Sequence, residues 1–367
     1  MAASVPGPQV NYPSSPPAAG SPSAASGLTL SWPNDSEPKI FFWGPPFAGK
    51  TTFLGALFIA QHRPQDFGTW AITANDDRAR QFQKDLTNSL ESKRQFPKAN
   101  VDIEAPMSWT FHGDLSNTSY GMRHGPADVP KILRGPRWNR RITDINFTLH
   151  LQDLPGGTFD PTNTATDRDQ VVEHLAKADA ILYLHDPRRD ADEDDSTTVE
   201  FFHDMLDSLM FNNRNDLIKG RLHHYVAACV TKFDHPGVYR PALKETFAIV
   251  DKNRPRAPRV TRENSRAFFN WICDQHRNAG VDLVRSALAD KFIGSRVSYY
   301  ATSAVGFYEA DHGIVDLADC SNLGTVRDEN GDMVDGIRGP LHPINVLEPL
   351  VDLVIKIRQA RPGTAAP

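Results

Sequence analysis

The sequence of 367 residues has few cysteines and no apolar run long enough to span a bilayer. Its three cysteines, Cys229, Cys273 and Cys320, are odd in number and widely separated, which fits a reducing compartment and offers no metal-ligand spacing. The N-terminus also lacks the basic and apolar regions of a secretory signal. We therefore expect a cytoplasmic protein without a transmembrane segment.

A strong charge of either sign is also missing, because 40 Lys and Arg residues stand against 45 Asp and Glu residues. A formal net charge of −5 does not attract nucleic acid or an anionic membrane, so no nucleic-acid partner is predicted. Hydrophobic residues make up 40% of the chain, which is enough for a large core. The length suits one domain with long insertions, or one domain plus a tail.

The most informative segment is Gly44-Pro45-Pro46-Phe47-Ala48-Gly49-Lys50-Thr51, which fits GxxxxGK[ST] and follows an apolar run at residues 39–43. This pattern between a strand and a helix is typical of a phosphate-binding loop. Gly44 lets the backbone leave the strand, and main-chain N–H groups can then point at a β-phosphate beside the positive end of the helix. These amides belong to Phe47, Ala48, Gly49, Lys50, Thr51 and Thr52.

Two side chains of this loop have expected roles of their own. The Lys50 ammonium reaches the β- and γ-phosphates and acts as the catalytic charge, and the Thr51 hydroxyl ligates Mg²⁺. The alternative is a glycine-rich strand-to-helix turn with an exposed lysine.

Two kinds of strand follow from the hydrophobic pattern. Nearly continuous apolar runs at 180–184, 225–230 and 297–301 are typical of a parallel sheet covered on both faces. Alternation at 107–111 and 145–151 predicts half-buried strands, most simply an antiparallel pair. Helices are predicted over 52–62, 76–93, 199–209, 265–273 and 345–358. The fold class is therefore α/β, with a doubly wound, mostly parallel sheet and one antiparallel strand pair.

The predicted organisation has a Pro-, Ser- and Ala-rich disordered tail at 1–38, one domain at 39–358, and a flexible tail at 359–367. Two insertions interrupt the domain: a basic loop at 112–141 and a Gly- and Asp-rich stretch at 311–343. The basic loop is either a solvated surface or a docking site for an acidic partner.

The second alternating strand is followed by Asp153-Leu154-Pro155-Gly156. A carboxylate at this strand end can hold a water on Mg²⁺, so Asp153 is a candidate metal ligand. The Gly156 N–H can approach the γ-phosphate, so Gly156 is a candidate catalytic residue. A simple Asp-Leu-Pro-Gly turn is the alternative.

The buried run at 225–230 is followed by Thr231-Lys232-Phe233-Asp234. Asp234 can accept hydrogen bonds from N1–H and the exocyclic amine of guanine, a donor pair that adenine does not present. The Lys232 stem can pack along the base plane, with Thr231 beside it. After the run at 297–301, a main-chain N–H of Ser303 or Ala304 can meet the guanine O6.

In this order, GPPFAGKT, DLPG, TKFD and TSA resemble the TRAFAC class of P-loop GTPases over about residues 39–358. The segments FFWGPPFAGKTTFLGAL and INVLEPLVDLV are most similar to prokaryotic Ras-like GTPase domains of multi-component signalling or conflict systems. The resemblance implies a Ras-like G domain that binds GTP or GDP with Mg²⁺ and switches a protein effector or regulator. An ATPase with the same loop and an inert nucleotide-bound interaction module are the alternatives.

Two positions depart from the family pattern. Asn100 stands near the place where relatives often have a threonine that closes over Mg²⁺, and Gly157 stands where many have a water-orienting glutamine. Glycine has no side chain to orient the attacking water, so slow intrinsic GTP hydrolysis is predicted, unless a partner or another residue positions the water.

Overall fold

The computed structural model describes residues 37–45, 48–62, 68–97, 107–116, 118, 144–151, 165–188, 197–250, 257–275, 281–310, 315–328 and 330–361. Several sequence predictions fall on other parts of the chain. These are the tail up to residue 36, Phe47, Asn100, the segment 152–157 with Asp153 and Gly156, most of the basic loop, and residues 362–367.

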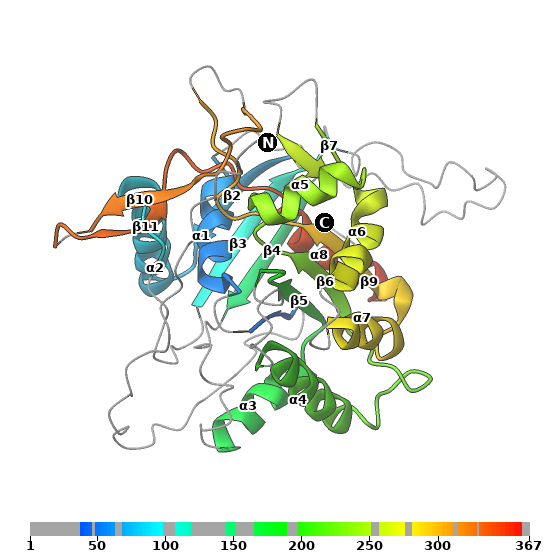
Figure 1. The fold of residues 1–367 in the computed structure, drawn as a ribbon. Helices are drawn as coiled ribbons and strands as arrows, with labels where there is room; N and C mark the ends of the chain where they lie inside the picture. The colour runs from blue at the N-terminus through cyan, green and yellow to red at the C-terminus, as the bar shows by residue number, and fades with distance from the viewer. Residues whose placement is uncertain are drawn as a thin grey trace.

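A parallel sheet of four strands lies at the centre of the molecule, in the order β1-β5-β6-β9 (Figure 1). The strands are β1 (Ile40–Trp43), β5 (Ala180–His185), β6 (Tyr225–Val230) and β9 (Val297–Ala301). One row of the register runs from Trp43 to Tyr183, then to Ala228 and Tyr299. The predicted parallel strands are confirmed, and their carboxyl ends meet at one edge of the sheet.

Side chains of the parallel strands alternate between two cores, which explains why the strands read as continuous apolar runs. Ile181 and Tyr183 pack into one core, whereas Leu182 and Leu184 pack into the other. The first core is shared with α3 (Ala165–Ala176), α4 (Thr197–Asn212), α6 (Arg262–Gln275) and α7 (Val281–Asp290), and the second with α1 (Lys50–Ala60) and α8 (Glu348–Ala360). Helices therefore cover both faces of the sheet, as the sequence predicted.

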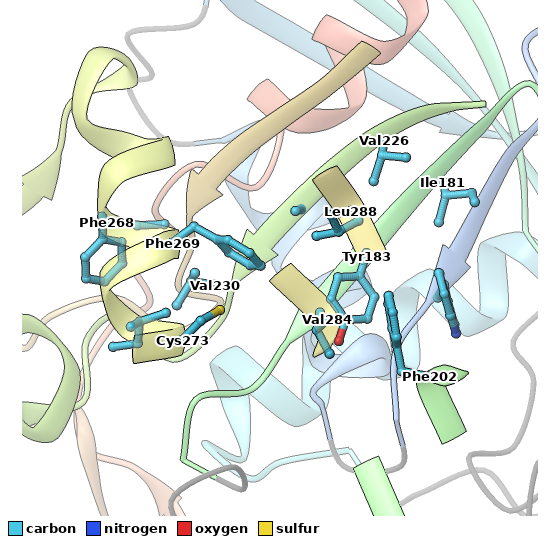
Figure 2. Close-up of a cluster of buried hydrophobic side chains, with 14 of the residues drawn as sticks. Ile181, Tyr183, Phe202, Val226, Val230, Phe268, Phe269, Cys273, Val284 and Leu288 are labelled. Carbon is cyan, nitrogen blue, oxygen red and sulfur yellow. The ribbon is translucent and has the colours of Figure 1, made fainter. Parts of the chain in front are cut away.

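Figure 2 shows part of the first core, where Tyr183 of β5 and Phe202 of α4 lie near Val284 and Leu288 of α7. The Tyr183 and Phe202 rings meet edge to face with centroids 5.2 Å apart. Burying each large apolar side chain contributes ~1.5–3 kcal/mol, so this packing helps to fix α4 and α7 against β5.

A separate antiparallel sheet has three strands in the order β2-β3-β4: β2 (Thr69–Ala74), β3 (Met107–Asp114) and β4 (Asp144–Leu151). Phe111 of β3 stands opposite Ile72 of β2 and Phe147 of β4. The predicted pair is therefore present, but it has a third partner. The Thr148 N–H of β4 donates to the Glu37 carboxylate just before β1 at 3.4 Å, so this sheet lies beside β1.

The remaining elements are α2 (Asp77–Thr87), a π-helical turn (Asn88–Ser92), α5 (Pro236–Lys244), β7 (Ala248–Val250), β8 (Pro258–Val260), a 3₁₀ turn (Gly294–Arg296), β10 (Leu323–Arg327) and β11 (Met333–Ile337). The strands β10 and β11 form an antiparallel hairpin within the predicted Gly- and Asp-rich insertion, and Figure 1 shows it beside α2. The strands β7 and β8 are antiparallel as well.

The prediction of one antiparallel strand pair is therefore wrong, because short strands with few apolar residues carry too weak a period to be recognised. Two segment boundaries also shift. The strand β3 continues to Asp114, inside the predicted basic loop, and α8 continues to Ala360, inside the predicted C-terminal tail. Among the described residues, no helix has both the length and the apolar character needed to cross a bilayer.

Candidate functional site

The segment that fits the phosphate-loop pattern connects β1 to α1. The chain leaves β1 at Trp43, and α1 begins at Lys50 after Gly49, whose φ of 89° lies in the left-handed region. Glycine adopts this conformation without steric cost. A Cβ on Gly44 would lie 3.0 Å from the Leu184 carbonyl oxygen, so the close approach of the loop to β5 also favours glycine.

The side chain of Lys50 folds back over this loop. Its Nζ donates to the carbonyl oxygens of Gly44 at 2.8 Å and Pro45 at 3.0 Å. The ammonium therefore lies at the N-terminus of α1, where the helix dipole is positive and where the first turn has no acidic residue. This end of the helix can attract an anion such as a phosphate group.

Thr51 and Thr52 occupy the first turn of α1, and both are partly exposed. Thr51 is one of the two predicted Mg²⁺ ligands, whereas the other, Asp153, lies outside the described residues. Within the described parts of the chain, no group of three His, Cys, Asp or Glu side chains is arranged to hold a metal ion. A single hydroxyl fits the shell of a hard cation but does not define a metal site.

The Thr231–Asp234 segment follows β6 and is bonded to the ends of both neighbouring strands. The main-chain N–H and the hydroxyl of Thr231 donate to the His185 carbonyl oxygen of β5 at 2.8 and 3.1 Å. The Phe233 N–H donates to the Thr302 carbonyl oxygen after β9 at 3.0 Å. Lys232 between them has a φ of 56°, a left-handed conformation that turns the chain sharply.

Asp234 is brought into contact with Ser303. The Ser303 hydroxyl donates to Asp234 Oδ1 at 2.5 Å, and the Gly306 N–H donates to Ser303 Oγ at 2.7 Å. Asp234 is 4% exposed. Burial raises the pKa of Asp234 to about 6, an effect that the Ser303 hydrogen bond partly opposes. The segments 231–234 and 303–306, which are far apart in the sequence, thus form one polar site at the sheet edge. Ala304, which follows Ser303, is partly exposed there.

Asp186 belongs to the same sheet edge, and the sequence analysis missed it. It directly follows β5 and is fully buried. Its Oδ2 accepts from Lys232 Nζ at 2.5 Å, and its Oδ1 accepts from the Arg188 N–H at 3.0 Å. Like the predicted Asp153, it lies directly at the end of a strand, but no motif marks it.

The two halves of the site lie on either side of the carboxyl end of β5. The loop with Gly44, Ala48, Gly49, Lys50 and Thr51 follows β1, and the pair of Asp234 and Ser303 follows β6 and β9. Two strand spacings separate β1 from β6 in the sheet, which corresponds to about 10 Å. A ribose can link a purine to its phosphates over a distance of this order.

No protein-family model and no curated protein matches this sequence. Among solved structures, the chain is similar to one chain of the "Signal recognition particle receptor SRb-GTP/SRX complex from Chaetomium thermophilum". The match has 15% sequence identity and a TM-score of 0.32, and it covers 73% of this chain and 94% of that chain.

Proposed function

We propose that the chain binds guanine nucleotides and acts as a GTP-dependent switch. The proposal depends most on the hydrogen bond between Ser303 and Asp234, which lies at the same sheet edge as the Lys50 loop. A purine site and a phosphate site about two strands apart are what a nucleotide needs.

In this proposal, Asp234 selects the base. Its carboxylate accepts hydrogen bonds from guanine N1–H and the exocyclic amine, while Lys232 packs its stem along the ring. Adenine presents no such donor pair and would leave the buried carboxylate without compensation. The sequence offered the N–H of Ser303 or Ala304 for the guanine O6, but the Ser303 N–H donates to the Ile344 carbonyl oxygen at 3.1 Å, so the Ala304 N–H is the proposed donor.

The phosphates bind at the start of α1. Lys50 exchanges its bonds to the Gly44 and Pro45 carbonyl oxygens for bonds to phosphate oxygens, which carry a full negative charge and are better acceptors. The amides from Phe47 to Thr52 complete the cradle, and for this the Ala48 N–H leaves the Pro45 carbonyl oxygen, to which it donates at 3.2 Å. Thr51 and Asp153 hold Mg²⁺, which neutralises charge on the β- and γ-phosphates.

The switch itself is proposed from the sequence resemblance. Gly156 contacts the γ-phosphate through its N–H, and GTP orders the segments around Gly156 and Asn100. Hydrolysis is slow because Gly157 cannot orient water. A cytoplasmic Ras-like GTPase domain with a protein effector, of the type found in multi-component prokaryotic systems, is the form of switch that we propose.

Identification of the copurifying nucleotide tests the proposal. Acid extraction and chromatography should give GDP or GTP, and calorimetry on magnesium-supplied, nucleotide-stripped protein should show tighter binding of GTP than of ATP. Tighter ATP binding favours the ATPase alternative. Bound guanine nucleotide without turnover in a single-turnover assay favours the inert module, and no heat with any guanine nucleotide overturns the proposal.

A further inference from the structure

The turn that carries Ser303 is enclosed by the two ends of the Gly- and Asp-rich insertion. On one side, Ser303 and Ile344 exchange two main-chain hydrogen bonds of 3.1 and 2.8 Å. On the other side, the Asn322 carboxamide reaches the Val305 carbonyl oxygen at 3.1 Å. Residues 303–306, which we call the base turn, therefore lie between chain segments that come before β10 and after β11.

Asn322 makes the central connection. It is fully buried, and its Nδ2 donates both to the Val305 carbonyl oxygen and to that of Pro340, each at 3.1 Å. Its Oδ1 accepts from the Gly339 N–H at 2.9 Å. Both donors and the acceptor of the carboxamide are thus used, which fixes the side chain in one orientation.

The tight conformation of the base turn depends on glycine at position 306. Gly306 has a φ of 71°, and a Cβ there would lie 1.9 Å from the His342 carbonyl oxygen. The Gly306 N–H holds the Ser303 hydroxyl at 2.7 Å, and that hydroxyl donates to Asp234. A chain of hydrogen bonds and close packing therefore runs from Asn322 through the base turn to the Asp234 carboxylate.

Apolar contacts also connect the base turn to the insertion. Val305 of the base turn shares a small buried cluster with Ile59 of α1, Leu90 of the π-helical turn, and Ile337 and Leu341 of the insertion. The Ile337 N–H also donates to the Arg94 carbonyl oxygen at 2.7 Å. The insertion is thus packed into the domain beneath the base turn.

We infer that Asn322 is a positioning residue for base selection, acting through Val305 and Ser303 on Asp234. This inference rests on the proposed guanine-nucleotide function. Without the carboxamide, the base turn loses one of the donors to its Val305 carbonyl, and Ser303 no longer holds the carboxylate in one direction. Guanine selectivity then falls, while the phosphate half of the site is unchanged.

The test compares Asn322→Ala with Asn213→Ala by calorimetry with GDP and ADP. Asn213 is a matched control, because it is buried and its Nδ2 donates to the Leu209 carbonyl oxygen of α4, outside the candidate site. Loss of a buried hydrogen bond lowers stability in both variants. We expect the ratio of GDP to ADP affinity to fall about tenfold in Asn322→Ala and to stay at the wild-type value in Asn213→Ala.

The outcomes separate the two proposals. If the wild-type protein shows no preference for GDP, the proposed function fails. If the wild type prefers GDP and Asn322→Ala keeps the full preference, the role of Asn322 is overturned. If Asn322→Ala does not fold, Asn322→Ser, which keeps one donor, is measured in the same way, and an unchanged ratio there also overturns the inference.

Discussion

The Ser303 hydroxyl donates a hydrogen bond of 2.5 Å to the Asp234 carboxylate, 69 residues earlier in the chain. The two side chains belong to turns after β6 and β9, which are neighbours in the parallel sheet. Each residue was a sequence candidate for the base, but the bond between them follows only from the fold. It leads directly to a prediction on specificity.

Asp234→Asn should weaken GTP binding about 100-fold or more and favour xanthosine triphosphate. The amide can donate to the xanthine C2 carbonyl, which replaces the guanine amine. Competition binding with both nucleotides measures the change, and Asp290→Asn at the exposed end of α7 is the control. An unchanged preference in Asp234→Asn would remove Asp234 from the base site.

The pH dependence of GDP binding should report the ionisation of the Asp234 carboxyl group. Burial raises the pKa of Asp234 to about 6, and guanine needs the ionised form. Below pH 6 the free protein must release a proton to bind, so GDP affinity should fall about tenfold per pH unit. Calorimetry from pH 5 to 8 tests this, and a flat profile would contradict it.

The stability of the nucleotide-free protein should depend on pH in the opposite sense. The folded pKa of Asp234 lies above the ordinary value of 3.8, so folding favours the protonated group. This contribution to the free energy of unfolding is fully present below pH 3.8 and is lost as pH rises through 6. Because neutral Asn resembles the protonated carboxyl, urea unfolding should show wild type and Asp234→Asn converging at low pH, with wild type losing stability relative to the variant as pH rises through 6.

Lys50→Met should lower GDP affinity about 100-fold, because charge-assisted hydrogen bonds contribute ~1.5–3 kcal/mol each. The thermal midpoint should change little, since Lys50 is partly exposed. Calorimetry measures the affinity. Lys177→Met, at an exposed position just after α3, serves as a control, and equal losses in both variants would refute the role of Lys50.

Lys232→Met should destabilise the fold by about 2–3 kcal/mol, because it leaves the fully buried Asp186 carboxylate without its cation. The cost is at the lower end for a buried pair, since the Lys232 side chain is 33% exposed. Adding Asp186→Asn should recover most of the loss. Urea unfolding of the single and double variants measures the coupling, and additive effects would argue against it.

Gly306→Ala should be much more disruptive than Gly220→Ala. Both glycines have left-handed φ values, 71° and 77°, so both substitutions cost about 1 kcal/mol in backbone strain. Only at Gly306 would the added Cβ meet a main-chain oxygen, that of His342, whereas nothing lies within 4 Å at Gly220. Equal unfolding free energies for the two variants would show that the turn can relax.

The hydrophobic pattern predicted the parallel strands well, because burial on both faces leaves a strong signal in each strand. It missed β2, where Trp70 and Ile72 are the only large apolar side chains that face the core. A strand with only two large apolar residues cannot be told from a loop by its hydrophobic pattern.

Polar residues were predictable only where a motif or a strand end marked them. Asp234 had both signals, Lys50 had the motif alone, and Asp186 had the strand end alone. Asn322 had neither, because its role depends on carbonyl groups of residues 305 and 340 that the fold brings to it. The roles of all these candidate residues remain predictions, and Phe47, Asp153 and Gly156 also lie outside the described residues.

Ile59 of α1 and Val305 of the base turn share one small buried cluster, so local unfolding should expose both of them. Side chains that share one small core open together, since exposing one removes the packing of the others. Amide hydrogens in the last turns of α1 and around Val305 should therefore exchange with solvent at similar rates. Binding or release of a nucleotide at the candidate site should then change the exchange rate at both places together.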